Sequence, residues 1–177
     1  KAIPLLVEAS MAFGTAHHDT TLGCLKALDL LVTEGFVSLN TADIGCGTAI
    51  LAMAAASVWP NLVFASDIDP VAVEVAKANV VANSLFEKVF CLEADGFDHP
   101  KLQTNGPFNL VFANILKSPL IKLAPMMSSR MAIGGRAILS GILIEQAEEV
   151  VARYAAVGLQ LCAREDIGDW STLILKK

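Results

Sequence analysis

The chain has 177 residues, 54% of them apolar, and 13 basic against 18 acidic residues give a net charge of −5. This length fits one domain with a full core, and the acidic balance argues against direct binding to nucleic acid, which needs a basic surface. The apolar runs are too short to span a bilayer and the first residues lack a signal peptide, so we expect a cytoplasmic protein with no membrane partner.

Helical and strand-like patterns alternate along the chain. Helices are predicted over Thr20–Glu34, Ala49–Trp59, Pro70–Asn83, Pro119–Arg130 and Ile144–Ala156. Strands are predicted over Asn40–Cys46, Leu62–Asp67, Lys88–Ala94, Phe108–Ile115, Gly135–Gly141, Leu159–Asp166 and Thr172–Leu175. We expect Asp19, Asp69 and Ser118 to be helix caps, the last two because a proline follows each of them.

This alternation is typical of an α/β, Rossmann-like domain that spans residues 1–177, with a mostly parallel, seven-stranded sheet and helices on both faces. Only Ile167, Gly168 and Asp169 separate Leu159–Asp166 from the final segment when that segment is taken as Trp170–Leu175, so we expect a hairpin and an antiparallel last strand. In open sheets of this kind, ligands bind at the carboxyl ends of the strands, near the point where the strand order reverses.

A glycine-rich turn with the sequence DIGCGT (43–48) lies between the first predicted strand and its helix. Gly45 and Gly47 let the backbone approach a ligand closely. Ile50 stands where the dinucleotide fingerprint G-x-G-x-x-G/A needs Gly or Ala. The turn instead suits a ligand without a pyrophosphate, such as S-adenosylmethionine, whose ammonium group Asp43 can meet directly or through water.

Two acidic residues follow the next strands. Asp67 ends the second predicted strand, where a carboxylate can accept hydrogen bonds from both ribose hydroxyls of an adenosine. We expect Ile68 to lie against the adenine ring. Asp95, just past the third strand, can accept from the adenine amino group, with Phe97 as an apolar wall.

Asn114 ends an apolar strand beside the same crevice, and its carbonyl oxygen could orient an acceptor amine towards the sulfonium methyl group. We expect a covering loop with Phe13, Gly14 and Thr15 to complete this acceptor site. The adjacent histidines at 17 and 18 lack a third ligand at metal-binding spacing, so we predict no metal site. The four cysteines lack metal or disulfide spacing, and we expect reduced thiols.

Together these residues resemble the PrmA family, the bacterial methyltransferases that modify a protein of the large ribosomal subunit. The resemblance covers nearly the whole chain. Its most specific segments are AFGTAHHDTT (12–21), DIGCGT (43–48), SDIDP (66–70), ANILKSPL (113–120) and LSGIL (139–143). It implies a class I methyltransferase fold, S-adenosylmethionine as the cofactor, and cofactor contacts at Thr21, Gly45, Asp67 and Asn114.

The chain departs from the family pattern at a few positions. Ala16 and Ala49 stand where the family commonly has Gly, and Asp19 stands where it often has Pro. We expect the methyl group of Ala49 to narrow the pocket below the methionine end of the cofactor, and Ala16 to stiffen the covering loop. The domain that presents the ribosomal protein in family members is not part of these residues.

The resemblance implies an enzyme that N-methylates amino groups of a protein, and we expect a ribosomal protein as its partner. Two alternatives stay open. The first is a class I methyltransferase that acts on another protein or small-molecule amine. The second is a non-catalytic domain that binds the cofactor weakly. The sequence leaves the oligomeric state open.

Overall fold

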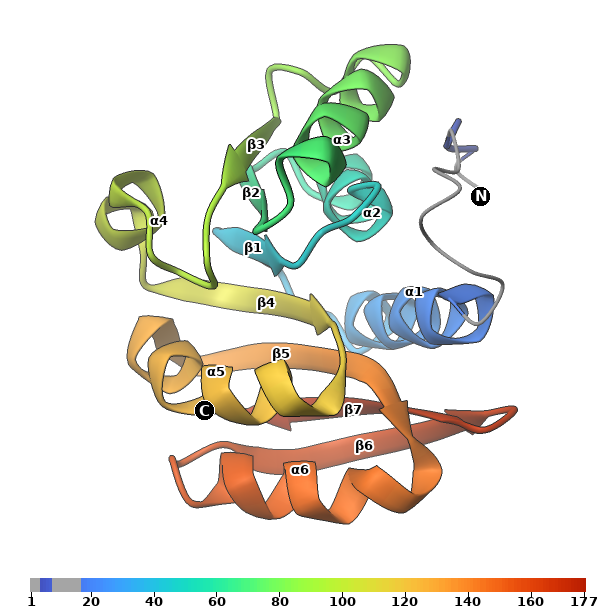
Figure 1. Ribbon diagram of the computed structural model, residues 1–177, viewed down its shortest axis with the longest axis vertical. Helices are drawn as coiled ribbons and strands as arrows, with labels where there is room; N and C mark the ends of the chain where they lie inside the picture. Colours follow the sequence, from blue (N-terminus) through green and yellow to red (C-terminus); the bar gives the residue numbers. More distant parts are fainter. Residues whose placement is uncertain (1–3, 8–16) are drawn as a thin grey trace.

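Seven strands form one sheet in the order β3-β2-β1-β4-β5-β7-β6 in the computed structural model, which describes residues 4–7 and 17–177 (Figure 1). The strands are β1 (Thr41–Ile44), β2 (Val63–Asp67), β3 (Val89–Glu93), β4 (Phe108–Asn114), β5 (Met131–Leu143), β6 (Gln160–Ile167) and β7 (Trp170–Lys176). The first five strands pair in parallel, whereas β7 runs antiparallel to both β5 and β6. The predicted mixed sheet and its final hairpin are therefore confirmed.

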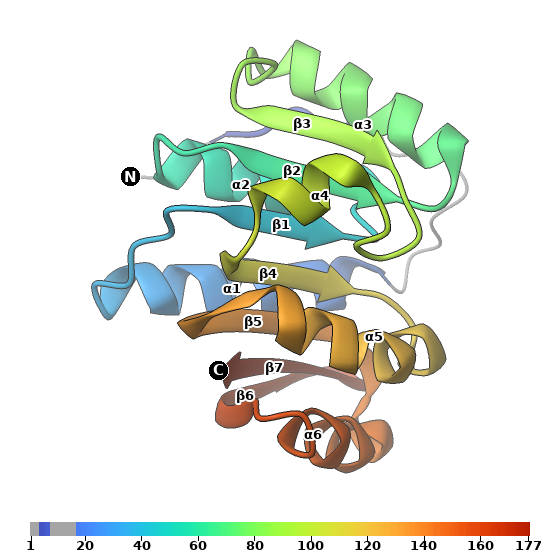
Figure 2. The same ribbon diagram turned by 90° about the vertical axis from the view of Figure 1, so that its left-hand side faces the viewer.

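Helices cover both faces of the sheet, as predicted (Figure 2). They are α1 (His17–Thr33), α2 (Ile50–Val58), α3 (Pro70–Ala82), α4 (Pro100–Asn105), α5 (Lys117–Arg130) and α6 (Ala147–Ala155), with a short 3-10 helix η1 (Ile144–Gln146). The helices α1, α2 and α3 pack on one face, and α4, α5 and α6 pack on the other. Successive side chains of a strand point to opposite faces of the sheet. Phe112 of β4 therefore packs in the core under α1, α2 and α3, and Ala113 packs in the core under α4, α5 and α6.

The start of α3 agrees with the sequence prediction. Asp69 is the N-cap, and its carboxylate accepts a hydrogen bond from the backbone N–H of Val71 at 2.8 Å. Pro70 occupies the first helical position, where a missing N–H leaves no intrahelical bond unmade. The chain leaves the sheet directly after Asp67, so this residue lies where the carboxyl ends of the parallel strands meet.

Two other predicted caps are wrong. α1 begins at His17, so Asp19 lies inside its first turn. A carboxylate there still stabilises the helix, because it is close to the positive end of the helix dipole. α5 begins at Lys117, and its N-cap is Leu116, which makes no side-chain cap bond. Pro119 is tolerated at the third position because the first N–H groups of a helix have no intrahelical partner.

Two further differences concern short elements. The six-residue helix α4 was not predicted, because it is too short to show a helical period; its single buried side chain is Leu102. The predicted helix Ile144–Ala156 is divided into η1 and α6. Within residues 4–7 and 17–177, none of the helices has the length and apolar character that a membrane span requires.

Candidate functional site

Three of the predicted site segments meet at the carboxyl ends of neighbouring strands. β1 lies between β2 and β4, and the register pairs Ile44 with Ser66 on one side and with Ala113 on the other. Gly45, Asp67 and Asn114 each follow one of these paired residues directly. The strand order reverses at β1, and this is the place where open α/β sheets bind their ligands.

Backbone hydrogen bonds hold the glycine turn against β2. Gly45 and Gly47 have positive φ angles of 71° and 53°, which side chains other than hydrogen rarely tolerate. The N–H groups of Gly45 and Cys46 both donate to the carbonyl oxygen of Ser66, at 2.8 and 2.9 Å. These two hydrogen bonds fix the glycine turn beside the carboxyl end of β2.

Asp67 links the glycine turn to the loop before α3. Its Oδ2 accepts from the N–H of Gly47 at 2.9 Å, and its Oδ1 accepts from the N–H of Asp69 at 3.0 Å. Each carboxylate oxygen can accept more than one hydrogen bond, so both oxygens retain capacity for ribose hydroxyls. Asp67 is half-buried, and the next side chain, Ile68, is 67% exposed despite being apolar.

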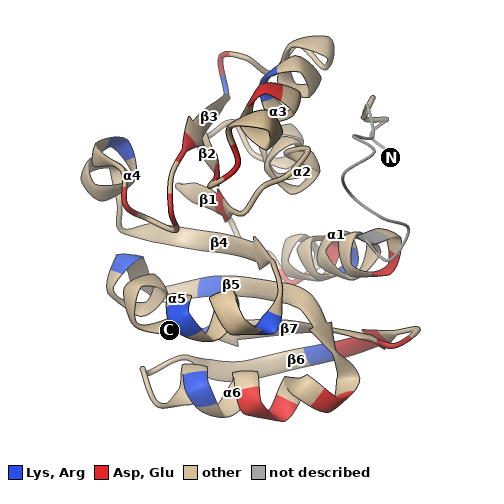
Figure 3. Cartoon of the chain, in the orientation of Figure 1, with Lys and Arg blue, Asp and Glu red and all other residues tan. Residues whose placement is uncertain are grey.

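Acidic residues also gather on the loops that follow β2 and β3 (Figure 3). Asp95 is exposed after β3, so its carboxylate is accessible to a ligand. Phe97 is not the expected wall of the adenine site, because it is fully buried and its ring lies 6.0 Å from the ring of Phe108 in the core under α4 and α5. The apolar side chain of Phe97 is stabilised more by burial in the core than it would be at the exposed edge of a ligand site.

Asp43 is a buried carboxylate beneath the glycine turn, with 1% exposure. Its Oδ2 accepts from the N–H of Ala52 at 3.0 Å, whereas Oδ1 has no hydrogen-bond partner in the part of the chain that the structure describes. The pKa of Asp43 is raised to about 7, mainly by burial and to a smaller extent by the charge of Asp67, while the hydrogen bond from Ala52 opposes both effects. Oδ1 is therefore available to a donor from a ligand, and a cationic donor would favour the ionised carboxylate.

Asn114 also carries an unpaired oxygen. Its Nδ2 donates to Oγ1 of Thr20 at 3.2 Å, and its buried Oδ1 has no partner among the described residues. The amide therefore keeps one strong acceptor for a donor from outside these residues.

Ile115 is a site residue that the sequence prediction missed. A Cβ on Gly45 would collide with the side chain of Ile115, and a Cβ on Gly141 would lie 2.5 to 2.9 Å from backbone atoms of Ile115. Both glycines have positive φ angles, 71° and 80°. Ile115 thus joins the glycine turn, the end of β4 and the middle of the LSGIL segment into one close-packed unit. Only the three-dimensional contact reveals this, because the segments are distant in the sequence.

The residue Ala49 adopts a conformation that favours glycine. It is the N-cap of α2 with φ 62° and ψ 22°, and such a left-handed conformation costs a non-glycine residue about 1–2 kcal/mol. Its methyl group is fully buried in the core on the α1, α2 and α3 face, so it does not project into an open pocket as expected. The alanine that replaces the family's glycine at position 49 is therefore expected to strain the backbone at the start of α2.

The predicted covering loop precedes α1 in the chain. Phe13, Gly14 and Thr15 lie outside the described residues, as does Ala16. Thr21 is half-buried in the first turns of α1, directly after Thr20. The covering loop and its contacts therefore stay predictions.

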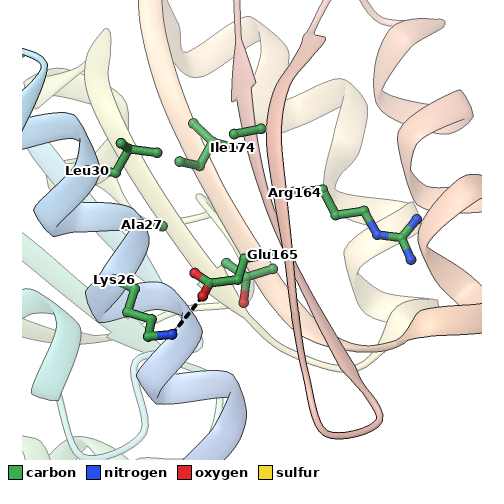
Figure 4. A pocket seen from close by; sticks show the side chains of 8 residues that line it. Lys26, Ala27, Leu30, Arg164, Glu165 and Ile174 are labelled. Atoms are coloured by element: carbon green, nitrogen blue, oxygen red, sulfur yellow. Dashed lines mark hydrogen bonds and ion pairs between the residues drawn. The ribbon is translucent and has the colours of Figure 1, made fainter.

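A pocket away from the predicted site lies between α1 and the β6–β7 hairpin (Figure 4). The residues that line it are Lys26, Ala27, Leu30, Ala163, Arg164, Glu165, Thr172 and Ile174, none of which is a predicted site residue. An ion pair of 2.7 Å between Lys26 and Glu165 crosses it. Elsewhere in residues 4–7 and 17–177, no three His, Cys, Asp or Glu side chains cluster as metal ligands would.

Comparisons with known proteins agree with this geometry. A family model described as ribosomal protein L11 methyltransferase (PrmA) matches residues 1–177. The ribosomal protein L11 methyltransferase of Chelativorans sp. is 44% identical over 175 residues, which cover 99% of this chain and 60% of that protein. The protein of the same name from Bradyrhizobium diazoefficiens is 46% identical over 171 residues, which cover 97% of this chain and 58% of that protein.

Among solved structures, a ribosomal protein L11 methylase from Lactobacillus delbrueckii subsp. bulgaricus superposes with a TM-score of 0.82 at 26% identity. The superposition covers 90% of this chain and 79% of that one. The chain spans 58 to 60% of the length of the two curated relatives. With this fold and these relatives, the chain belongs to the ribosomal protein L11 methyltransferase (PrmA) family.

Proposed function

We propose that this chain is the catalytic domain of an S-adenosylmethionine-dependent N-methyltransferase that modifies amino groups of a bacterial ribosomal protein in the cytoplasm. The observation that carries the proposal is the meeting of Gly45, Asp67 and Asn114 at the ends of β1, β2 and β4. The names of the 44% and 46% identical relatives support L11 as the substrate.

The chemistry of the site residues supports this cofactor. We predict that the carboxylate of Asp67 accepts hydrogen bonds from the ribose hydroxyls, and that Asp95 accepts from the adenine amino group. Oδ1 of Asp43 has no hydrogen-bond partner among the described residues, and the ammonium group of the methionine moiety would favour the ionised form of this carboxylate. Ile68 offers an exposed apolar surface next to Asp67 for the adenine ring.

The bound cofactor supplies an electrophilic methyl group on a sulfonium, and the chain must position a nucleophile in line with it. A lysine or α-amino group attacks only after it loses its proton, since the ordinary pKa of a lysine is about 10.4. A neutral amine still has N–H groups. One of them can donate to Oδ1 of Asn114, which leaves the amine lone pair free to face the methyl group.

The first prediction tests this role of Asn114. Asn114→Ala is expected to lower methyl transfer from labelled S-adenosylmethionine to ribosomal protein L11 by about 100-fold, because a misplaced acceptor loses the benefit of orientation. The affinity for S-adenosylhomocysteine, measured by calorimetry, should fall by less than the turnover does, because the cofactor retains its contacts with the ends of β1 and β2.

A matched control is Asn105→Ala, which removes the same side chain from an exposed position at the end of α4 and should leave turnover unchanged. Turnover and cofactor affinity that are both unaffected by Asn114→Ala would contradict the proposed acceptor site. Transfer to small amines but not to L11 would favour the alternative amine substrate, and cofactor binding without any transfer would favour the non-catalytic alternative.

A further inference from the structure

Thr20, in the first turn of α1, lies against the end of β4. Its Oγ1 accepts a hydrogen bond from Nδ2 of Asn114 at 3.2 Å, although 94 residues separate the two in the sequence. Thr20 has an exposure of only 1%, so solvent does not compete for this contact. The hydrogen bond therefore connects Asn114, the residue proposed to orient the acceptor amine, to helix α1.

In the observed orientation the NH2 group of the Asn114 amide points to Thr20. The oxygen of Asn114 is then the atom without a partner among the described residues. An asparagine side chain can turn by 180° and present either its NH2 group or its oxygen to a ligand. Because a threonine hydroxyl can accept or donate, Thr20 fixes the place of the amide, and the substrate amine selects between its two orientations. An amine that approaches with an N–H needs the oxygen, and the opposite orientation would place two donors face to face.

The position of Thr20 is itself fixed by close packing of α1 on the sheet. Gly23, one turn further along α1, lies so near Thr172 of β7 that a Cβ would collide with the threonine hydroxyl. That hydroxyl lies 2.9 Å from Oγ of Ser140, the residue that pairs with Asn114 across β4 and β5. The helix and the strand end are thus anchored to the same part of the sheet, which limits how far Thr20 can move from Asn114.

We propose that Thr20 is a positioning residue for methyl transfer, which holds the Asn114 amide in the place where its Oδ1 can face the acceptor amine. This inference rests on the proposed function. It predicts an effect on turnover that is separate from cofactor affinity, because Thr20 acts on the acceptor side of the site.

The test compares Thr20→Val, which removes the hydroxyl at nearly constant size, with Thr20→Ser, which keeps it. Thr20→Val is expected to lower kcat with L11 and S-adenosylmethionine by about tenfold or more, and to leave the Kd of S-adenosylhomocysteine within about twofold. Thr20→Ser should restore kcat. Thr33→Val makes the same change at an exposed position at the end of the same helix and should behave as wild type.

A second measurement does not depend on activity. The side-chain amide resonances of Asn114, identified by their loss in Asn114→Ala, should shift in Thr20→Val and stay in place in Thr20→Ser and Thr33→Val. Normal turnover with an unshifted amide in Thr20→Val overturns the inference alone, as does an equal loss of kcat in the valine and serine variants. A wild-type chain that binds no cofactor and methylates nothing overturns the proposed function and with it the catalytic role of Thr20.

Discussion

Between pH 5 and pH 8, the wild-type chain is expected to lose about 3 kcal/mol more of its free energy of unfolding than the Asp43→Asn variant. Burial raises the pKa of Asp43 from its ordinary value of 3.8 to about 7 in the folded chain. Below about pH 4 the group is protonated in both states, and its contribution to stability is fully present. As the pH rises, the unfolded chain ionises first, so this contribution is lost progressively until the folded group ionises near pH 7.

Urea unfolding of the cofactor-free chain at the two pH values measures the effect. Asp69→Asn makes the same chemical change at an exposed helix cap and should follow the wild type at both values. The affinity for S-adenosylhomocysteine should also rise severalfold from pH 5 to pH 8 in the wild type only, since a bound ammonium group favours ionised Asp43. A difference between wild type and Asp43→Asn that is the same at pH 5 and pH 8 would contradict this account.

Gly141→Ala is expected to destabilise the chain by about 3 kcal/mol or more, because it combines an unfavourable φ with a collision. At φ 80° a side chain is strained, and the new Cβ would lie 2.5 Å from the carbonyl oxygen and 2.9 Å from the amide nitrogen of Ile115. Backbone atoms cannot turn away as a flexible side chain can. Ile115 must therefore shift, and the adjacent Asn114 must shift with it. We expect methyl transfer to fall by about 100-fold as well.

Gly134→Ala is the matched control, because it lies on the same strand β5 with a φ of 78° and nothing within 4 Å of the added Cβ. It carries only the backbone strain and is expected to cost about 1 kcal/mol, without loss of turnover. Equal destabilisation by the two variants in urea unfolding would show that the contact between Gly141 and Ile115 does not hold the turn after β4.

Much of this fold could be predicted because its signals are local. Asp69 and Pro70 define the start of α3 by cap chemistry that acts within three residues, and the structure confirms it. The end of α2 and the final hairpin depend likewise on Pro60 and Gly168, which act on their own neighbours. The expected caps at Asp19 and Ser118 were wrong: Asp19 lies inside the first turn of α1, and α5 begins without a side-chain cap, which is possible when tertiary packing stabilises a helix.

The candidate site was predictable only in part. Gly45, Asp67 and Asn114 are recognisable because each stands at the carboxyl end of an apolar strand, and parallel strands end at the same edge. Ile115 and Thr20 carry no such signal, because their contacts with Gly141 and Asn114 join segments that are distant in the sequence. Phe97 was misplaced for the same reason, since only the position of α4 and α5 shows that it lies in the core.

The most direct test of the central claim is a calorimetric titration of the chain with S-adenosylhomocysteine, with NAD as the comparison ligand. We predict one binding site for S-adenosylhomocysteine and none for NAD. Asp67→Ala should weaken binding by about 10- to 100-fold, the expected cost of losing hydrogen bonds to a charged group. Asp69→Ala should retain the affinity and lose only about 1 kcal/mol of stability with its helix cap. No binding by the wild type, or equal affinities in the Asp67 and Asp69 variants, would contradict the assignment of the glycine turn and Asp67 as the cofactor site.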